Sequence, residues 1–541
     1  MSTPPPNSLS QQPESVGWLT GGKLVVIALL TLVSWVVLSA PTIPLGIPGE
    51  WTWARRALAE IDPLEVIRTL SLCGGYWTAI VWRERNHKSP VVLCVIAFLW
   101  LNGVLYLQPD VQGLSRAPTV LYYKRTEGYF WQAAFEVEDS KEFLAGYRAA
   151  ISTGNDPDRY LHIGTHPPGL TLGYRALLSL FQSSPALTNA VIRLEPGSMK
   201  EAIEALGQFP TPKGQFAREY EATLWTATLL TLLAVAGTCW PIYCLTARMS
   251  DPITAWRAAA IWPLVPSLVV FFPKSDLFCP MLATMSCWLW LEGWSRLSLW
   301  RCVLAGMGFF CGLMITLALA PVALLLVIQT ILERWTRKES FRERTAMGDI
   351  ECVLAALLGF VVSLSALSIW GTCNLAGVWL QNLKNHGMFY DHNSRTYLGW
   401  LALNPIEAAI ALGVPLACCA AMGLVRAWNR RSQTAVNDGP AIAFSQGAAW
   451  FAVWSILWLS GKNMGEAARL WIFLAPWPVM TALVGLSRVP ASAAPSPTSS
   501  LYRGSAHEKL LWRMLLILQV ITCLWTMWSV DGFHFAELMP E

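Results

Sequence analysis

The feature that most constrains this chain of 541 residues is a series of long apolar runs. Each is about 17–25 residues, enough for a helix to cross a hydrocarbon core of about 30 Å. Backbone groups in lipid must bond within their own segment, so such runs must be helical. The sequence therefore predicts an all-α polytopic membrane protein. About thirteen runs qualify by this length criterion, at residues 22–40, 65–82, 90–108, 221–247, 253–272, 277–295, 300–316, 318–334, 350–371, 401–425, 442–460, 468–487 and 509–529.

Composition supports the membrane class. Only 14% of the residues are charged and 54% are hydrophobic, whereas soluble domains are roughly a quarter charged. The 13 cysteines are scattered, mostly inside apolar runs, and none form a C-x-x-C pair. Cysteines in such runs act as small apolar side chains, so the sequence indicates neither a disulfide framework nor a zinc site.

The distribution of Lys and Arg predicts sidedness, because cytoplasmic loops carry an excess of both. Basic residues fall in loops that share one side if the N-terminus is cytoplasmic: Arg83, Arg85, Lys88, Arg334, Arg337, Lys338, Arg342, Arg344, Arg426, Arg430, Arg431, Arg488, Arg503 and Lys509. Segments 109–220, 273–276, 372–400 and 461–467 then lie on the outer face. We expect a multi-pass protein of a bacterial inner (plasma) membrane.

The chain divides into four parts. Residues 1–21 are rich in Pro and Ser and are expected to be a disordered cytoplasmic N-terminus. They lack the basic region and cleavage site of a signal peptide, so the first span should remain as an anchor. Residues 22–108 form a three-helix N-terminal addition, 109–220 an outer acidic loop with interfacial helices, and 221–541 the main helix bundle. Within the loop, 169–183 is apolar but short. It is either an interfacial or re-entrant helix, or 184–200 crosses back.

The outer loop is unusually acidic for such an apolar chain. Its carboxylates include Glu127, Glu136, Glu138, Asp139, Asp156 and Asp158. They suit the solvated face of an amphipathic interfacial helix. Alternatively, one of them takes the proton of an acceptor hydroxyl, and a neighbour binds a divalent cation through oxygen. No cofactor is definite from the sequence, and a divalent metal, Mg or Mn, stays an alternative.

The loop ends in His166-Pro167-Pro168-Gly169. Two prolines fix two φ angles and disfavour helix at His166, which is therefore held on an extended segment just before a helix begins. Proline is also common at helix starts, so a simple start signal with a solvated imidazole is the alternative to a substrate contact.

Two further outer segments carry charge next to spans. The short loop FFPKSD places Lys274 and Asp276 at the membrane surface. Lys274 suits a phosphate as a point charge, or it is a snorkelling lysine beside an Asp276 helix cap. Arg469 lies at the beginning of a span, where a charge is costly unless paired or functional. Glu466 is the obvious pairing partner.

The segment 386–397 contains His386, Asp391, His392 and Arg395. Their spacing is a weak metal pattern, and we expect a surface loop that contacts the acceptor or a lipid headgroup. No phosphate-binding glycine motif precedes a helix in a suitable context. Soluble nucleotide chemistry and ATP-driven transport therefore have no support, and we expect no nucleic-acid partner.

Together these motifs resemble the GT-C superfamily of polytopic glycosyltransferases, which includes protein O-mannosyltransferases and the aminoarabinose and arabinofuranosyl transferases. The resemblance covers most of 90–490. It rests on Glu127-Gly128-Tyr129, on His166-Pro167-Pro168-Gly169, on the PKSD loop and on RLWIFLAPW near the end. Three spans precede the acidic loop where one is usual, which is why the N-terminal part is taken as an addition.

The resemblance implies roles for these residues. Glu127 would be the catalytic base, with Glu136, Glu138 and Asp139 as alternatives. The substrate or phosphate contacts would be His166, Lys274, Asp276 and Arg469. The partners would be a polyprenyl-phosphate sugar donor, membrane lipids, and an acceptor that is a glycan, lipid or protein. A sugar would pass with inversion to an acceptor hydroxyl at the outer face.

The sequence leaves two other classes of protein as alternatives. A transporter or flippase of a lipid-linked sugar would also have many spans. However, transporters often contain repeated halves with broken helices, and this sequence shows no such duplication. Their charges also tend to lie at mid-span, whereas the charges here gather at one face. A non-catalytic scaffold explains the helices but leaves the acidic loop and His166-Pro167-Pro168-Gly169 unexplained.

Overall fold

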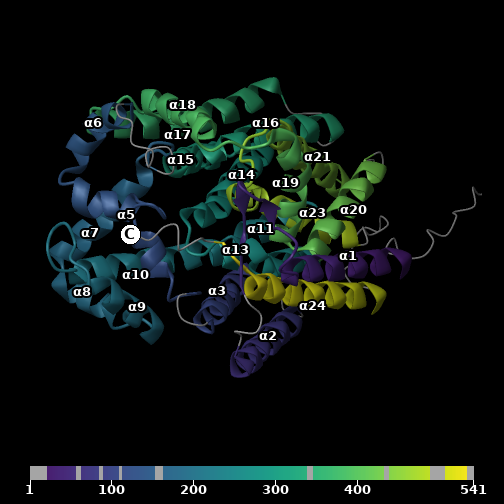
Figure 1. Cartoon of the computed structure of the whole chain (residues 1–541). Coiled ribbons are helices and arrows are strands. Elements are labelled where there is room, and N and C mark those ends of the chain that lie inside the picture. Colours follow the sequence, from purple (N-terminus) through teal and green to yellow (C-terminus); the bar gives the residue numbers. More distant parts are fainter. Residues whose placement is uncertain are drawn as a thin grey trace, which may run out of the picture.

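The structure is a computed structural model of the whole chain, shown in Figure 1. It describes residues 21–56, 62–84, 89–108, 112–152, 163–337, 345–431, 438–487 and 506–532. The predicted disordered N-terminus, the carboxylates Asp156 and Asp158, and several of the basic loop residues lie outside these ranges. The side chain of His392 is also outside the description.

The described chain is almost entirely helical, as predicted. The long and intermediate helices are α1 (Gly21–Ser39), α2 (Pro63–Arg83), α3 (Pro90–Tyr106), α10 (Arg218–Gly237), α11 (Cys239–Ala247), α12 (Pro252–Ile261), α14 (Cys279–Arg296), α15 (Leu299–Ile315), α16 (Ala320–Thr336), α17 (Ala346–Trp370), α18 (Leu375–His392), α19 (Tyr397–Leu412), α20 (Val414–Arg430), α21 (Gly439–Leu459), α23 (Pro476–Leu486) and α24 (Ala506–Ser529). Many begin with proline at the first or second position, where the missing N–H would have no helical partner.

Shorter elements connect and cover these helices. They are α4 (Ala117–Tyr122), α5 (Tyr129–Trp131), the π-helix η3 (Gln132–Glu136), α6 (Ser140–Ser152), α7 (Gly169–Ser183), α8 (Pro185–Ile192), α9 (Gly197–Gly207), α13 (Pro266–Val270), α22 (Ala467–Leu470), and the 3₁₀ turns η5 (Trp262–Leu264), η6 (Ser275–Phe278), η7 (Leu317–Leu319) and η8 (Ile472–Leu474). Strands β1 (Gly46–Ile47) and β2 (Trp51–Thr52) form a hairpin, and β3 (Ala54–Arg55) pairs antiparallel with β4 (Val530–Asp531).

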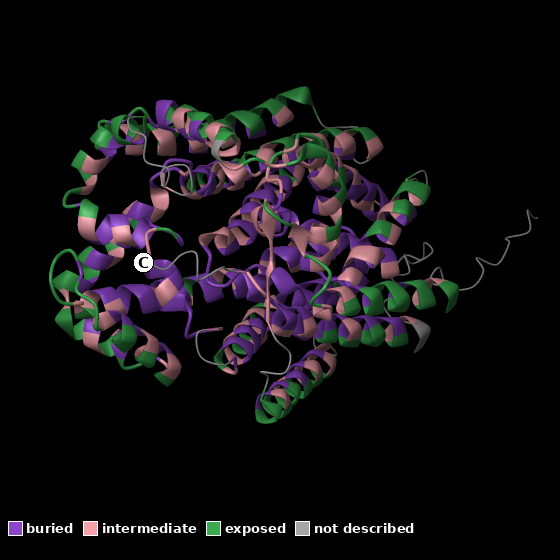
Figure 2. Ribbon diagram, viewed as in Figure 1, coloured by how far each residue is buried: buried purple, intermediate pink, exposed green. Residues whose placement is uncertain are grey.

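The chain is an integral membrane protein with several spanning helices. Seven described helices are long and apolar enough to cross a membrane, or eight if one bent pair counts as a single span. Helix α17 is an example: Val353, Leu357 and Val361 are about half exposed, on a face that lipid would cover (Figure 2). The predicted number of thirteen is not confirmed. Helices form at the other predicted positions, but they are shorter or less apolar.

One predicted span, 401–425, is broken. Helices α19 and α20 meet at 108°, and Gly413 between them has φ 94°. A side chain could not replace this glycine, because a Cβ would lie 2.3 Å from Nε2 of Gln519. That Nε2 donates to the carbonyl oxygen of Leu412 at 2.9 Å, so the bend is held by a buried hydrogen bond.

The predicted outer loop forms a separate group of short helices, seen on the left of Figure 1. Helix α7 has 15 residues, α8 has 8 and α9 has 11. A span needs about 20 residues, so none of these is long enough. Neither 169–183 nor 184–200 forms a helix of spanning length, and the interfacial or re-entrant placement of 169–183 stays a prediction.

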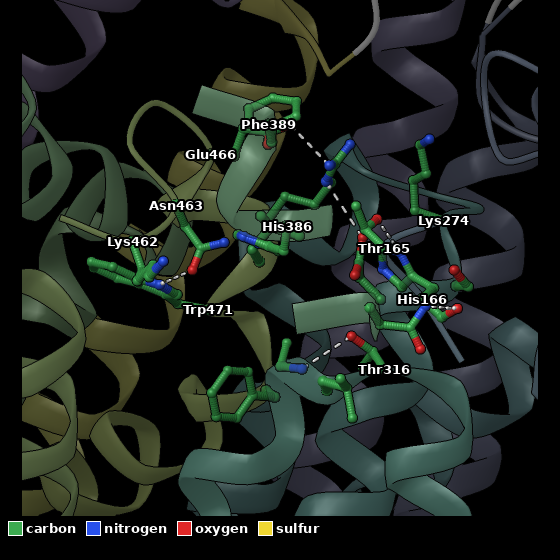
Figure 3. Close-up of a pocket in the computed structure, with 18 of the residues that line it drawn as sticks. Thr165, His166, Lys274, Thr316, His386, Phe389, Lys462, Asn463, Glu466 and Trp471 are labelled. Carbon is green, nitrogen blue, oxygen red and sulfur yellow. Dashed lines mark hydrogen bonds and ion pairs between the residues drawn. The ribbon is translucent and has the colours of Figure 1, made fainter. Parts of the chain in front are cut away.

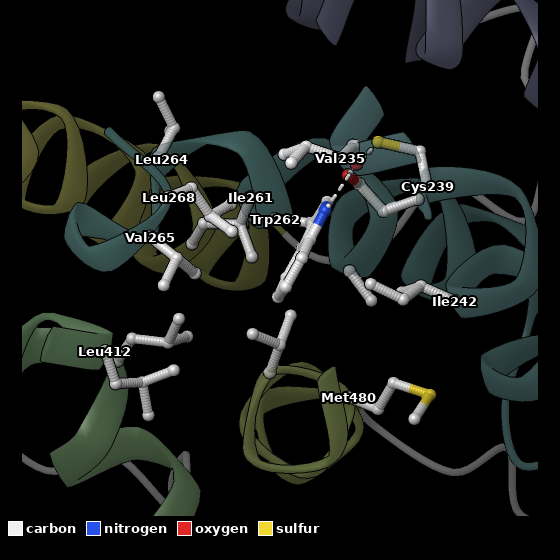
Figure 4. Packing of buried hydrophobic residues seen from close by; sticks show 14 of the residues in the cluster. Val235, Cys239, Ile242, Ile261, Trp262, Leu264, Val265, Leu268, Leu412 and Met480 are labelled. Atoms are coloured by element: carbon white, nitrogen blue, oxygen red, sulfur yellow. Dashed lines mark hydrogen bonds between the residues drawn. The ribbon is translucent and has the colours of Figure 1, made fainter. Parts of the chain in front are cut away.

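The N-terminal part is joined closely to the rest of the chain. Helix α1 packs against α20 and α24, and β3 pairs with β4 near the end of the described chain. The main core lies between the long helices around Trp262, whose indole donates to the carbonyl oxygen of Val235 at 2.8 Å. Cys239, Ile242 and Met480 surround it (Figure 4). The predicted domain boundaries stay a prediction.

Candidate active site

Five residues from four distant segments of the sequence line one cavity of about 240 Å³. They are Glu127, His166, Lys274, Asp276 and Arg469, which include every substrate-contact residue predicted from the sequence. The folding of the chain brings them together. Figure 3 shows part of the lining. Other residues that line this cavity are Tyr129, Thr316, Asn382, His386, Tyr390, Lys462, Asn463, Glu466 and Trp471.

Glu127 is held in a tight turn before α5. Gly128 follows it with φ 79°, a left-handed conformation suited to glycine. The Glu127 side chain is 2% exposed. Its Oε1 accepts a hydrogen bond from the backbone N–H of Ser275 at 2.7 Å. Among the described residues, its buried Oε2 has no hydrogen-bond donor. Buried carboxylate oxygens are rarely left without a donor, so Oε2 keeps an unused acceptor position in a residue that lines the cavity.

Lys274 approaches Glu127 from the short loop before α14. It is 4% exposed, and its Nζ donates to the carbonyl oxygen of Thr126, next to Glu127. Asp276 in the same loop faces Arg469, with Oδ2 3.4 Å from Nε. Arg469 also pairs with Glu466 at 2.8 Å, so the simple pairing suggested by the sequence is confirmed and Asp276 is added to it. Each of the two cations, Lys274 and Arg469, therefore lies beside at least one carboxylate.

Burial shifts the titration of the central pair. It raises the pKa of Glu127 above the usual carboxyl value, and the nearby Lys274 ammonium only partly opposes this. Burial, followed by the positive charge of Arg469, lowers the pKa of Lys274 to about 8. Both groups thus titrate closer to neutral pH than exposed ones, which favours proton transfer.

His166 reaches the cavity from the segment before α7. Its Nδ1 is 3.0 Å from Oγ1 of Thr165, and its backbone carbonyl accepts from Tyr147 Oη at 2.9 Å and Asn382 Nδ2 at 3.0 Å. The glycine that follows the prolines is required sterically. A Cβ on Gly169 would lie 2.3 Å from the carbonyl oxygen of Met314. The four-residue motif therefore permits close packing and fixes the His166 backbone.

The other candidate carboxylates of the loop do not line this cavity. Glu136 forms an exposed ion pair with Lys124 at 3.4 Å. Glu138 is exposed. Asp139 is exposed too, and its Oδ1 accepts from the backbone N–H groups of Lys141 and Glu142 at 2.9 and 2.8 Å, as a helix cap does.

Several cavity residues were not chosen from the sequence. The segment beginning at His386 was expected to be a surface loop, which is wrong for its first part because α18 continues to His392. His386 and Tyr390 lie one helical turn apart and both line the cavity. Their i,i+4 spacing in the sequence could have indicated that both side chains lie on one face of a helix. Lys462 and Asn463 carry no comparable signal, because an irregular turn positions them.

The described residues do not fit a divalent cation. They contain no group of three or more His, Cys, Asp or Glu side chains placed to hold a metal. Glu127 and Asp276 instead face Lys274 and Arg469. The chemistry below is therefore derived from side chains alone.

A second cavity, of about 200 Å³, lies on the inner side of the bend between α19 and α20. Its walls are mainly alanine and aromatic side chains, including Ala408, Ala417 and Trp454. Trp471 lines both cavities, so the polar and the apolar cavity are neighbours.

A scan of family models finds no match, and a search of curated proteins finds none. Among solved structures, the chain is similar to the Archaeoglobus fulgidus oligosaccharyltransferase in complex with Zn and sulfate. The TM-score is 0.45 at 11% identity, over 82% of this chain and 54% of that one. It is also similar to the oligosaccharyltransferase AglB of that organism with an inhibitory peptide and a dolichol-phosphate. There the TM-score is 0.47 at 11% identity, over 84% and 57%.

The chain thus spans about half the length of these two proteins.

Proposed function

We propose that this protein is a membrane glycosyltransferase that moves a sugar from a polyprenyl-phosphate-linked donor to an acceptor hydroxyl, with inversion. One observation carries the proposal. Glu127 lines a polar cavity and has a buried carboxylate oxygen with no donor among the described residues, and that cavity adjoins an apolar one at Trp471. A hydroxyl acceptor and a lipid-linked donor need these two environments side by side.

In this reaction an acceptor hydroxyl donates to Glu127 Oε2. Its oxygen attacks the anomeric carbon from the face opposite the phosphate. The new carbon–oxygen bond forms as the bond to the phosphate oxygen breaks, and the phosphate leaves with the electron pair. Glu127 takes the hydroxyl proton, as a general base. Its raised pKa makes it a better proton acceptor than an exposed carboxylate.

The predicted contact residues have complementary roles. Lys274 and Arg469 supply positive charge where negative charge develops on the leaving phosphate. Asp276 holds Arg469 in place at 3.4 Å. His166, whose backbone is fixed by Tyr147 and Asn382, contacts the substrate from the same side of the cavity as Lys274. Each cation is already paired in this structure, so its full charge reaches the phosphate only as its partners rearrange.

The apolar cavity would take the lipid part of the donor. Its alanine-rich walls leave room for a chain, and only Ser267 among its lining residues carries a hydroxyl. The distribution of Lys and Arg between the spans supports the sidedness that we propose, with the site at the outer face of a bacterial inner membrane and the N-terminus in the cytoplasm. The acceptor is a glycan, a lipid or a protein.

The test is transfer of radiolabelled sugar from polyprenyl-phosphate donors by membranes that carry wild type, Glu127→Gln or Glu138→Gln. Both substitutions remove one carboxylate from the same loop, but only Glu127 lines the cavity. We expect loss of transfer with Glu127→Gln alone. Loss with Glu138→Gln alone would reassign the base. No transfer by wild type, together with donor flipping in liposomes, would favour a transporter.

A further inference from the structure

The polar cavity has two ends of different character. Figure 3 shows His166 and Lys274 on one side, Lys462, Asn463 and Trp471 on the other, and His386 between them. The first we call the carboxylate end, because it contains Glu127. The second contains no carboxylate among those labelled other than Glu466, which is bound to Arg469 at 2.8 Å.

The cations of the carboxylate end are committed to partners. Lys274 is buried and interacts with the charge of Glu127. Arg469 pairs with both Asp276 and Glu466. A phosphate that enters this end meets Glu127 and Asp276, and like charges repel it. Lys462 differs: it is exposed at the cavity wall and has no ion-pair partner among the described residues.

Lys462 is carried by a fixed turn. Gly461, Asn463 and Gly465 all have left-handed backbones, with φ 64°, 61° and 83°. The Tyr390 hydroxyl accepts from the backbone N–H groups of Asn463 and Met464, at 2.7 and 3.2 Å. Asn463 is among the few residues that adopt this conformation readily. The sequence of the turn is thus matched to its shape, and the shape sets the position of Lys462.

His386 lies close enough to respond to Lys462. Burial, and after it the Lys462 charge, lowers the pKa of His386. The imidazole is therefore neutral near pH 7 in this structure and keeps one N–H to donate. An anion placed between the two side chains would relieve their repulsion and accept from both.

The position of this pair relates it to the apolar cavity. Trp471, which lines both cavities, donates from Nε1 to Asn463 Oδ1 at 3.3 Å. The turn that carries Lys462 is thus fastened to the side chain at the junction of the two cavities. An anion at Lys462 would lie at the entrance to the apolar space.

We propose that Lys462 and His386 bind the phosphate of the prenyl donor in the ground state, with the prenyl chain in the apolar cavity. This rests on the proposed transferase function. It divides the work of the cavity: Lys462 and His386 hold the donor, while Lys274 and Arg469 act as charge develops. Lys462 should then affect the donor KM, and Lys274 should affect kcat.

Binding can be measured without turnover, with radiolabelled farnesyl phosphate as the probe and purified protein in detergent. We expect Lys462→Ala to weaken binding roughly tenfold or more, the loss typical of a hydrogen bond to a charged group. His386→Asn should weaken it less, and Lys462→Arg should retain it. Farnesol and inorganic phosphate should compete poorly, because each offers only half of the ligand.

Lys384→Ala is the matched control. Lys384 is exposed on α18, two residues from His386, and does not line the cavity. Equal losses with Lys384→Ala and Lys462→Ala would overturn the proposal as general surface charge. Wild-type binding by Lys462→Ala, with loss in Lys274→Ala, would move the phosphate to the carboxylate end. Inorganic phosphate competing as well as farnesyl phosphate would overturn the lipid assignment.

The two proposals fail separately. If no donor supports sugar transfer but farnesyl phosphate binding depends on Lys462, the phosphate site stands and the transferase fails. If transfer occurs and Lys462→Ala leaves the donor KM unchanged, the transferase stands and this phosphate site fails.

Discussion

Two buried charge clusters lie at opposite ends of helix α16, and they differ in how fully their acids are bonded. At its start, Leu317 and Pro321 line the cavity that contains Glu127. At its end lies Glu333, 0% exposed. The helix has 17 residues, so the ends are roughly 25 Å apart at 1.5 Å per residue.

Glu333 is saturated. Its Oε2 pairs with Arg248 at 3.0 Å and Arg337 at 3.3 Å, and its Oε1 accepts from Gln329 at 2.9 Å. Glu127 has a single hydrogen bond from the described residues and one oxygen without any. The comparison teaches that burial of a charge does not identify a site. A buried acid whose bonds are complete is structural, and one left incomplete beside a cavity is placed for a ligand.

The largest expected effect is on turnover at the cavity. Glu127→Gln should lower sugar transfer by about 10²–10⁴-fold, the usual contribution of a general base. It should not lower thermal stability, because the amide removes a buried charge and can still accept from Ser275. Transfer rate and thermal midpoint in detergent check both. A normal rate with a lowered midpoint would make Glu127 structural, like Glu333.

The reverse pattern is expected for Glu333→Gln. Removing one partner of a buried ion pair costs about 3–5 kcal/mol of unfolding free energy. Arg248 loses the Glu333 carboxylate, whereas Arg337 keeps Asp438 at 2.7 Å. Transfer per folded molecule should stay at the wild-type value. Folded yield and thermal midpoint measure the loss of stability. Transfer assays on folded protein from a single preparation measure the activity per folded molecule. A stable but inactive variant would break the contrast between the clusters.

A smaller effect is expected from pH. Lys274, with its pKa of about 8, loses its proton as pH rises through that value. Transfer should therefore fall on the alkaline side near pH 8. On the acid side, transfer should fall as Glu127 is protonated, at a pH above the usual carboxyl range. Lys274→Arg should move only the alkaline limb upward, because arginine stays charged. An alkaline limb that does not move would exclude Lys274 as its source.

The smallest effect concerns the turn that carries Lys462. Tyr390→Phe leaves the N–H groups of Asn463 and Met464 without their acceptor. A lost hydrogen bond costs about 1 kcal/mol, or roughly fivefold in the donor KM. Tyr106→Phe, on a half-exposed tyrosine away from the cavity, is the control. Equal KM values for all three proteins would show that Tyr390 does not set the turn.

Much of the site was predictable because its chemistry is local in the sequence. Lys274 and Arg469 are charges next to apolar runs, and His166 precedes two prolines, so each is conspicuous without a structure. His386 was mistaken for a loop residue, because the apolar pattern of α18 fades before the helix ends at His392. Lys462 was not predicted, because its position depends on an irregular turn with three left-handed residues and on two hydrogen bonds to the Tyr390 hydroxyl.

The sequence by itself determined the membrane class and the helical fold, because hydropathy and backbone satisfaction in lipid act on each segment separately. It also determined that reactive residues gather in the segments between spans. Only the tertiary structure decided which of these carboxylates lines the cavity. Glu127 and Ser275 are 148 residues apart and share a hydrogen bond, whereas Glu138 and Asp139 are exposed and do not line the cavity. The physical reason is that bonding of a buried acid depends on donors from distant helices, which no local pattern records.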